Sequence, residues 1–419
     1  MAKIDPVRIA ARLSAPVVAM RRPSERAALV IAPTDVGSLG DAAMLIAAYQ
    51  TLKDQGFDRV SCVSSAEWAD SGVFDAYYWA DDHFFDGNMR SLARLLWKVR
   101  DYEAVFFVGA DVLDGTYNAG SVARRLQVLD WFAAQGKTAT VLGSSFTETP
   151  NALCCETLRA FPANATINAR DPVSKARMER FLERPITLVA DVAFLAQPDP
   201  TVPQARDFET WIAARRAAGD RIVAINANYH NDAKVPGYTA KHVDIARALL
   251  DANTSLIFVP HDTRTKRSDV VVVEEIMAAL PAGSADRVRY CEPTDPRAVK
   301  AILAMCDFIV TGRMHVAILG MGAGVPAYSF GYQGKFEGLY KLLGLPAEKL
   351  LENPADIVSR FDEILANILA GLDEAKTHAA TLEAALPGVR AMSLANFAMP
   401  GKPPRAAAAR GGSRVAAGA

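Results

Sequence analysis

The sequence predicts an α/β fold with two Rossmann-like domains, each built on a parallel sheet, that face a shared cleft. Short apolar runs alternate with amphipathic helical segments along most of the chain, which is typical of parallel sheets covered by helices. At 419 residues the chain is too long for one ordinary hydrophobic core. Three prolines within ten residues, at 196–205, separate two halves that each show this alternation.

The domain boundaries follow from that break. Residues 1–24 are a basic leader that we expect to be poorly ordered. Residues 25–195 form the N-terminal Rossmann-like domain, residues 196–206 the Pro-rich linker, and residues 207–386 the C-terminal Rossmann-like domain. Residues 387–419 are rich in Ala, Arg and Gly, and we expect a largely disordered tail there.

In the N-terminal half, apolar runs of strand length alternate with segments of helical periodicity. The expected strands cover 27–32, 59–64, 104–108, 138–142, 166–169 and 186–189. The expected helices cover 43–53, 91–100, 120–135, 153–161 and 174–182. The acidic and aromatic segment 79–86 is expected to be a loop.

The C-terminal half repeats the alternation. Its expected strands cover 221–226, 255–259, 288–290, 308–310 and 325–330. Its expected helices cover 208–217, 239–251, 269–279, 295–305 and 316–322, with an interrupted helical region at 355–385. Because the carboxyl ends of parallel strands meet at one edge of a sheet, the loops after the strands of both halves are expected to face the cleft.

Composition limits the classes of protein. A net charge of −1 gives no overall attraction to nucleic acid or to anionic membranes. The five cysteines are an odd number without a C-x-x-C pair, which argues against a disulfide framework or a structural zinc site and favours a cytoplasmic location. No apolar run approaches the roughly 18 residues of a membrane span.

The loop after the first strand contains Gly37, Gly40 and Asp41. It matches neither G-x-G-x-x-G nor a P-loop. The two glycines would let the backbone approach a ligand at the end of the strand. Asp41 has two interpretations, an N-cap of the following helix or a ligand contact.

Arginines follow two of the strands, at Arg170 and Arg313. A guanidinium matches the geometry of a carboxylate or phosphate, so both are candidates for binding an anion. The alternative for each is a structural ion pair, and for Arg170 the adjacent Asp171 is the obvious partner. Asn226 ends another strand of the C-terminal half.

The segment Thr311-Gly-Arg-Met-His places Arg313 and His315 where a strand becomes a helix. A helix N-terminus offers unpaired N–H groups and the positive end of the helix dipole, which favour anions. An anion site or an ordinary surface turn would both fit this pattern. His315 is the first candidate for a general acid or base and His261 the second, whereas His230 is expected to be merely solvated.

Two further patterns have competing interpretations. His261 and Asp262 with Asp269 could suggest a metal site, but no third ligand has a suitable spacing, so no metal is predicted. The aromatic and Gly-rich segment 328–340 could stack on a sugar ring while Lys335 reaches a phosphate. The alternative is a helix start packed on the core.

Taken together, these motifs resemble the polysaccharide pyruvyl transferase family over residues 25–350. The resemblance rests on five segments in the family's order: Gly37-Ser-Leu-Gly-Asp, Arg170-Asp-Pro-Val-Ser, Asp191-Val-Ala-Phe, Val259-Pro-His-Asp, and Thr311-Gly-Arg-Met-His with Val325-Pro and 331–338. It implies a fold similar to the two-domain GT-B glycosyltransferases. It also implies transfer of the pyruvyl group of phosphoenolpyruvate to a sugar, with formation of a pyruvate ketal and without a further cofactor.

The resemblance assigns roles to particular residues. Arg170, Arg313 and His315 become the catalytic residues, with His315 as general acid, and Met314 lines the same pocket. The other candidates for donor or acceptor binding are Gly40, Asp41, Asn226, His261 and Lys335.

The acceptor and its location stay open. A sugar, a lipid-linked oligosaccharide and a polysaccharide all fit, and no nucleic acid partner is expected. The basic stretches 8–26 and 402–414 would suit peripheral contact with the inner face of the membrane, or they could be disordered ends. Two other functions compete: a GT-B nucleotide-sugar glycosyltransferase, and a non-catalytic binding subunit of a polysaccharide pathway.

Overall fold

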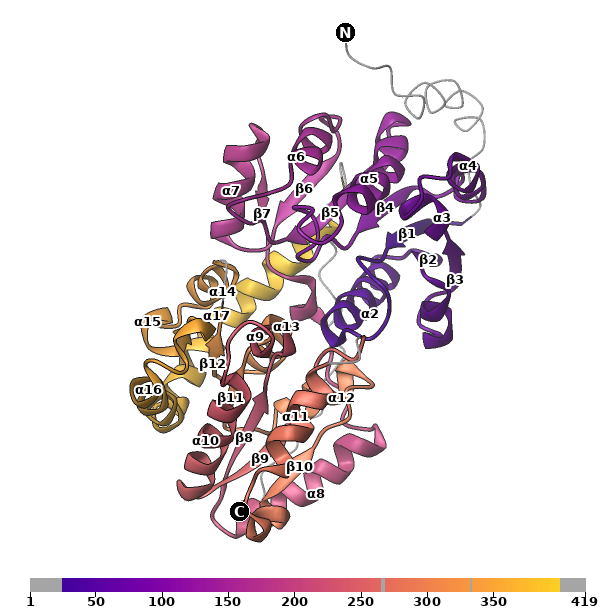
Figure 1. Cartoon of the computed structure of the whole chain (residues 1–419). Helices are drawn as coiled ribbons and strands as arrows, with labels where there is room; N and C mark the ends of the chain where they lie inside the picture. The colour runs from indigo at the N-terminus through magenta and orange to yellow at the C-terminus, as the bar shows by residue number, and fades with distance from the viewer. Residues whose placement is uncertain (1–24, 265–267, 332–333, 400–419) are drawn as a thin grey trace.

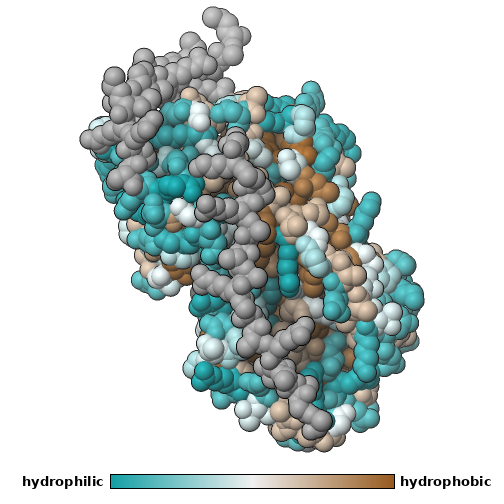
Figure 2. Space-filling model, turned by 180° about the vertical axis from the view of Figure 1, so that it is seen from behind, coloured by the Kyte–Doolittle hydropathy of each residue, from teal (hydrophilic) through white to brown (hydrophobic). Residues whose placement is uncertain are grey.

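The computed structural model describes residues 25–264, 268–331 and 334–399. Figure 1 shows two α/β domains, one above the other, and we call the junction between them the waist. The expected leader at 1–24 and the end of the expected tail, at 400–419, lie outside the described residues. Seen from behind, polar residues predominate on the surface, and apolar residues form smaller groups (Figure 2).

The N-terminal sheet has seven parallel strands in the order β3-β2-β1-β4-β5-β6-β7. The strands are β1 (Ala27–Ile31), β2 (Arg59–Ser64), β3 (Ala76–Trp79), β4 (Ala104–Phe107), β5 (Thr138–Ser144), β6 (Thr166–Ala169) and β7 (Thr187–Leu188). The helices of this half are α2 (Leu39–Asp54), η1 (Ala66–Ser71), α3 (Asp81–Phe84), α4 (Met89–Lys98), α5 (Ala119–Ala134), α6 (Ala152–Arg159), α7 (Pro172–Leu182) and η2 (Val192–Leu195).

The apolar runs form strands because the sheet is buried on both faces. All five residues of β1 are buried; Ala28 and Val30 pack into one core, and Leu29 and Ile31 into the other. Successive side chains of a strand point to opposite faces, so a strand between two helix layers must be apolar throughout.

The C-terminal sheet has six parallel strands in the order β10-β9-β8-β11-β12-β13. They are β8 (Arg221–Asn226), β9 (Thr254–Phe258), β10 (Val288–Tyr290), β11 (Phe308–Thr311), β12 (Ala327–Phe330) and β13 (Leu351–Glu352). The first helices are α8 (Pro203–Ala217), α9 (Tyr229–Asp232), α10 (Tyr238–Asp251), α11 (Asp269–Ala278), η3 (Ala282–Arg287), α12 (Pro296–Leu303) and α13 (Met314–Met321). Then come α14 (Lys335–Leu343), α15 (Ala347–Leu350), η4 (Pro354–Asp356), α16 (Phe361–Asp373), α17 (Ala375–Leu394) and η5 (Ala395–Phe397).

The predicted fold class, two parallel-sheet domains, is confirmed. Some boundaries were wrong. Segment 79–86 is not a loop, because β3 ends at Trp79 and α3 covers Asp81–Phe84; the edge strand β3 lacks the strong apolar run of a central strand. The linker is shorter than 196–206, since Pro203 begins α8 as its first helical residue, a position where the missing N–H of proline costs nothing.

The expectation of a disordered tail from residue 387 onward is wrong as far as residue 399. Helix α17 continues through Pro387 to Leu394. Leu382, Leu386 and Val389 are buried along one side of it, whereas Pro387 is exposed. The carbonyl that loses its partner at the proline can therefore face water, and the apolar contacts outweigh the cost of proline.

The end of this helix returns to the N-terminal domain (Figure 1). The buried Asn396 side chain accepts a hydrogen bond from the Gly143 N–H at 2.6 Å and donates one to the Ala190 carbonyl at 2.8 Å. The chain therefore crosses between the domains twice, once through η2 and once through the end of α17.

A third connection joins the domains through their loops. The Leu39 N–H donates to the His261 carbonyl at 3.1 Å, and the Thr263 N–H donates to the Gly37 carbonyl at 2.9 Å. Ser38 and Asp262 form an antiparallel bridge between these bonds. We call this short pairing of residues 37–39 with 261–263 the interdomain seam. Among the described helices, none combines the length and apolarity needed to cross a bilayer.

We expect Asn396→Ala to lower the free energy of unfolding by about 2–4 kcal/mol, because it leaves a buried N–H and a buried carbonyl without partners. Urea unfolding followed by circular dichroism measures the effect. The control is Asn367→Ala on α16, where the half-buried side chain makes no hydrogen bond to a described residue. Equal unfolding midpoints for the two variants would contradict the importance of this contact.

Candidate functional site

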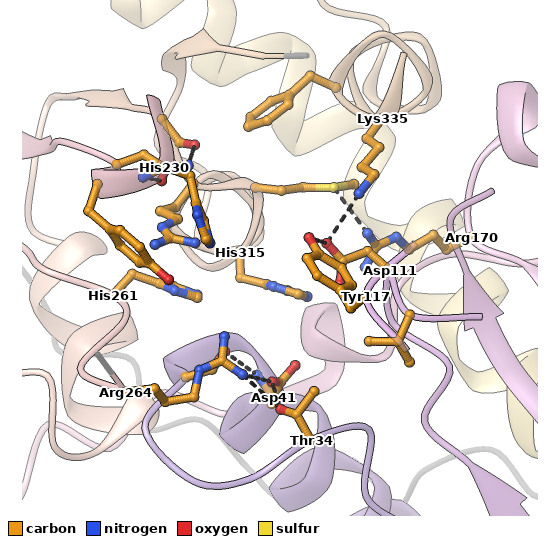
Figure 3. A pocket seen from close by; sticks show the side chains of 18 residues that line it. Thr34, Asp41, Asp111, Tyr117, Arg170, His230, His261, Arg264, His315 and Lys335 are labelled. Atoms are coloured by element: carbon orange, nitrogen blue, oxygen red, sulfur yellow. Dashed lines mark hydrogen bonds and ion pairs between the residues drawn. The ribbon is translucent and has the colours of Figure 1, made fainter. Parts of the chain in front are cut away.

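A cavity of about 340 Å³ lies between the domains. Every loop that lines it follows the carboxyl end of a strand, as expected for a doubly wound sheet. From the N-terminal domain, the segments after β1, β4 and β6 contribute Asp41, Asp111 and Arg170. From the C-terminal domain, the segments after β8, β9, β11 and β12 contribute His230, His261, Arg313, Met314, His315 and Lys335. Figure 3 shows labelled side chains of both domains pointing into this one space.

Arg170 is buried and paired with Asp191. Its Nη1 lies 2.7 Å from Asp191 Oδ2, and its Nε donates to Ser145 Oγ at 2.8 Å. The adjacent Asp171 is not the partner, since it caps α7 by accepting from Ser174 N–H at 2.8 Å. The other Arg170 nitrogen, Nη2, lies 3.3 Å from the sulfur of Met314. A thioether is a weak acceptor, so a ligand oxygen could replace it at this nitrogen.

Burial alone would raise the pKa of Asp191, but the charge of Arg170 and the neighbouring His315 outweigh burial and hold it well below its usual range. Asp191 therefore carries a permanent negative charge at neutral pH. Its Oδ2 lies 3.6 Å from His315 Nε2. This carboxylate is placed to accept a hydrogen bond from a protonated His315 ring.

Arg313 is the N-cap residue of α13, at the predicted junction of strand and helix. Its Nε and Nη2 donate to the two carboxylate oxygens of Asp269, at 2.9 and 2.8 Å. The guanidinium also lies over the Tyr229 ring, 5.1 Å from its centroid. Asp269 and Tyr229 thus fix the orientation of Arg313 at the cavity wall.

His315 follows in the first turn of α13 and crosses toward the N-terminal domain. A side chain at Gly40 would overlap the His315 ring, so only glycine leaves space for this close approach. The His261 and His315 rings are parallel to within 5°, with centroids 6.0 Å apart. Nε2 of His315 has no hydrogen-bond partner among the described residues.

His261 joins the domains as well as lining the cavity. Its Nε2 accepts a hydrogen bond from the Gly40 N–H at 3.1 Å. Burial, together with the nearby charges of Arg313 and His315, lowers the pKa of His261 well below its usual value. The ring is therefore neutral near pH 7, which leaves Nε2 available as an acceptor.

Asp41 does not cap α2. The cap is Ser38, whose Oγ accepts from the Asp41 N–H. The Asp41 carboxylate instead accepts from Thr34 Oγ1 at 2.8 Å and lies 3.6 Å from Arg264 of the C-terminal domain. Burial raises the pKa of Asp41 despite the opposing charges of Arg264 and His315, so this carboxylate holds a proton more readily than an exposed one.

On the opposite wall, Lys335 Nζ lies 3.1 Å from Asp111 Oδ2, across the domain boundary. Burial would raise the pKa of Asp111, but the charges of Lys335 and Arg170 hold it well below its usual range. The hydroxyl of Tyr117 also donates to this carboxylate at 3.3 Å. Lys335 is thus at the cavity, as predicted, and it faces an acid that we did not predict.

Three predicted placements need correction. Gly40, which we expected to contact a ligand, is not among the residues that line the cavity; it lies against His315, and its N–H donates to His261. Asn226 does not line the cavity; it is fully buried behind it, donating to the Val259 carbonyl at 2.9 Å and to Asp269 at 3.3 Å. Asn226 therefore supports the carboxylate that orients Arg313. His230 is not merely solvated, because it lines the cavity and lies against Tyr229 with ring centroids 4.0 Å apart.

Several residues of the site escaped the sequence analysis. Asp191 belongs to the Asp191-Val-Ala-Phe motif, but the sequence did not predict that it lies at the site. Asp111 follows the strand β4, and Arg264 follows His261 by three residues; strand-end position was the available signal for both. Within the described ranges, no group of three or more His, Cys, Asp and Glu side chains is arranged to hold a metal ion.

The fold and the cavity define a two-domain α/β protein of the GT-B type, with an arginine- and histidine-containing site between its domains. Solved structures support the fold. A putative UDP-N-acetylglucosamine 2-epimerase from Listeria monocytogenes has a TM-score of 0.56 at 15% identity, covering 87% of this chain and 92% of its own. UDP-GlcNAc 2-epimerase from Neisseria meningitidis, bound to UDP-GlcNAc, has a TM-score of 0.55 at 11% identity, covering 88% and 97%.

A glycosyltransferase from Rickettsia africae is similar at a TM-score of 0.51 and 12% identity, covering 88% of this chain and 96% of its own. The model of the family described as polysaccharide pyruvyl transferase matches residues 39–334. The chain therefore belongs to the polysaccharide pyruvyl transferase family, a family of transferases. No sequence among functionally curated proteins matches it significantly.

The lowered pKa of His261 predicts an acid-sensitive seam. In the unfolded chain this histidine takes up a proton below about pH 6.5, whereas the folded state resists protonation. The free energy of unfolding is therefore not reduced by His261 above about pH 6.5. Below that pH it falls progressively, until the pH reaches the pKa of His261 in the folded state. Urea midpoints measured between pH 7.5 and 5 should fall less steeply for His261→Gln than for wild type. Identical slopes would contradict a neutral, buried His261.

Proposed function

We propose that this transferase moves the pyruvyl group of phosphoenolpyruvate onto two hydroxyls of a sugar, in a polysaccharide or its precursor, to form a pyruvate ketal. One observation carries the proposal: Arg170 and His315 meet from opposite domains around Asp191, with Arg313 and Met314 beside them. All five residues lie within the range matched by the family model.

Donor binding uses the cationic walls of the cavity. Phosphoenolpyruvate carries a carboxylate and a phosphate, and the two guanidinium groups of Arg170 and Arg313 suit these anions. Lys335, at the other wall, is a third cation that could contact the phosphate. Each of these side chains already contacts a carboxylate of the protein. In this proposal the oxygens of phosphoenolpyruvate bind the same cations, either beside those carboxylates or in their place.

The chemistry needs a proton at the methylene carbon of the donor. His315 supplies it in this proposal, and Asp191 holds the imidazole in place. Protonation makes C2 electron-poor, so a sugar hydroxyl adds there and loses its proton. Phosphate then leaves with its bonding electron pair, and a second hydroxyl closes the ketal. Two hydroxyl protons are released; one balances the proton used at the methylene carbon and the other leaves with phosphate.

A base is required for those hydroxyl protons, and Asp41 is our candidate. It lies at the cavity wall formed by the β1–α2 loop, and its raised pKa suits a group that accepts a proton during the reaction. Arg264 and Thr34 hold its carboxylate in place. No further cofactor enters this scheme, because fixed charges around the donor stabilise the transition state.

The nearest competing function is a nucleotide-sugar glycosyltransferase, which the shared fold would also serve. A ligand that binds only the folded state raises its unfolding temperature. We expect phosphoenolpyruvate to raise the unfolding temperature of this protein and UDP-sugars to leave it unchanged. The reverse pattern would favour the glycosyltransferase.

The catalytic roles are tested by phosphate release in the presence of phosphoenolpyruvate and a sugar acceptor. We expect His315→Gln and Arg313→Ala each to lower turnover by about 10²–10³-fold, because one removes the proton donor and the other a donor-binding charge. Arg206→Ala, an exposed arginine on α8, is the control. Unfolding is measured in parallel, since Arg313→Ala leaves Asp269 buried without its guanidinium. Near wild-type turnover in both variants would refute the assignment.

A further inference from the structure

Helix α4 presents an unusual outer face. Trp97 is 69% exposed and Met89 48% exposed, although aromatic and large apolar residues are normally covered. Arg90, Ala93, Arg94 and Lys98 are also exposed on this helix. The helix lies at the side of the N-terminal domain, away from the waist (Figure 1).

Helical geometry gathers these residues on one side. Arg90, Arg94 and Trp97 are spaced i, i+4 and i+7, and Met89, Ala93 and Trp97 are spaced i, i+4 and i+8. Both rows therefore meet at Trp97. The opposite side consists of Leu92, Leu95 and Leu96, all buried in the domain core. The outer face is thus held rigidly by the fold and needs no ordering before it makes a contact.

The charges of this face are unbalanced. The side chains of Arg90 and Arg94 make no hydrogen bond or ion pair with any described residue, and α4 contains no acidic residue. Arg100, just beyond the helix, stacks on Trp97 with its guanidinium 4.2 Å from the ring centroid. Asp101 lies 3.8 Å from Arg100 and neutralises it in part. Arg90, Arg94 and Lys98 thus place three cations around an exposed indole, and Lys98 also lies 6.0 Å from the centroid of the Tyr78 ring.

We propose that this outer face of α4, formed by Met89, Arg90, Ala93, Arg94, Trp97 and Lys98, docks on the headgroup region of an anionic lipid bilayer. Tryptophan favours the boundary between headgroups and acyl chains, where the ring is in an apolar environment and the indole N–H stays hydrated. The three cations match anionic headgroups, and each contributes roughly a fivefold gain in binding. The whole chain has a net charge of −1, so it has no overall attraction to an anionic bilayer. Binding to such a bilayer would therefore depend on this local cluster of cations.

This proposal is independent of the reaction assigned above, because none of these residues lines the cavity. It also differs from an attachment through the basic terminal stretches, which lie outside the described residues. Docking through α4 would hold a folded, active domain at a surface where lipid-linked sugars are found.

Flotation of the full-length protein with phosphatidylglycerol–phosphatidylcholine vesicles tests the proposal. We expect wild type to bind these vesicles, to bind pure phosphatidylcholine vesicles at least tenfold more weakly, and to dissociate at high salt. Arg90→Glu/Arg94→Glu should lower binding at least tenfold, and Trp97→Ser should lower it severalfold. The matched control is Arg206→Glu/Arg289→Glu, two exposed arginines of the C-terminal domain, which should bind like wild type.

Urea unfolding midpoints of the α4 variants should match that of wild type, which shows that they remain folded. Absence of wild-type binding to anionic vesicles would overturn the proposal. So would full binding by Arg90→Glu/Arg94→Glu, because the attachment would then reside elsewhere in the chain. Binding that is lost equally in the control pair would mean a non-specific charge effect, and would overturn it as well.

Discussion

The carboxylate of Asp191 is the interaction on which the site depends. One of its oxygens faces Arg170 of the N-terminal domain and His315 of the C-terminal domain, at 2.7 and 3.6 Å. The other carboxylate oxygen of Asp191 accepts a hydrogen bond from the Ala193 N–H at the start of η2. The backbone carbonyl of Asp191 accepts a hydrogen bond from the Ser393 hydroxyl on α17. A single buried residue therefore contacts Arg170, His315 and both crossings of the chain. Removing its charge would leave Arg170 buried without a counter-ion, a change that typically costs several kcal/mol.

Ion pairing sets the electrostatic character of the cavity. Arg170, Arg313 and Lys335 each face a carboxylate before any ligand arrives. A buried pair such as Arg170–Asp191 contributes little net stability, because desolvation offsets the attraction between its charges. The pairs hold the guanidinium groups in defined orientations, so the proposed anionic donor would meet side chains that are already ordered. A protein with balanced overall charge can in this way gather several cations around one cavity.

The sequence was sufficient for the parts that depend on local pattern. Apolar runs predicted the central strands of both sheets but missed the edge strands β3 and β13. The Pro-rich break lies between the two sheets, and Arg313 and His315 were correctly placed where a strand becomes a helix. The partners of these residues could not be predicted, because Asp191 and Asp269 are brought to the arginines by the packing of separate strands. Asp41 illustrates the same limit: it and Ser38 are both suitable caps, and only the backbone direction at the start of α2 selects Ser38. The predicted end of order at residue 387 was wrong because the apolar contacts of α17 outweigh the low helix propensity of Pro387.

The paired crossings of the chain have a mechanical consequence. The segment around Asp191 and the segment around Asn396 lie against each other at the waist. A rotation about the line that joins these two attachment points would separate the cavity walls while leaving both crossings intact. Such a rotation would have to break the backbone bonds between Gly37 and Thr263 and between Leu39 and His261, and also the contacts of Lys335 with Asp111 and of Arg264 with Asp41. Several polar contacts therefore hold the two sides of the cavity together, and one of them involves His261, which itself lines the cavity.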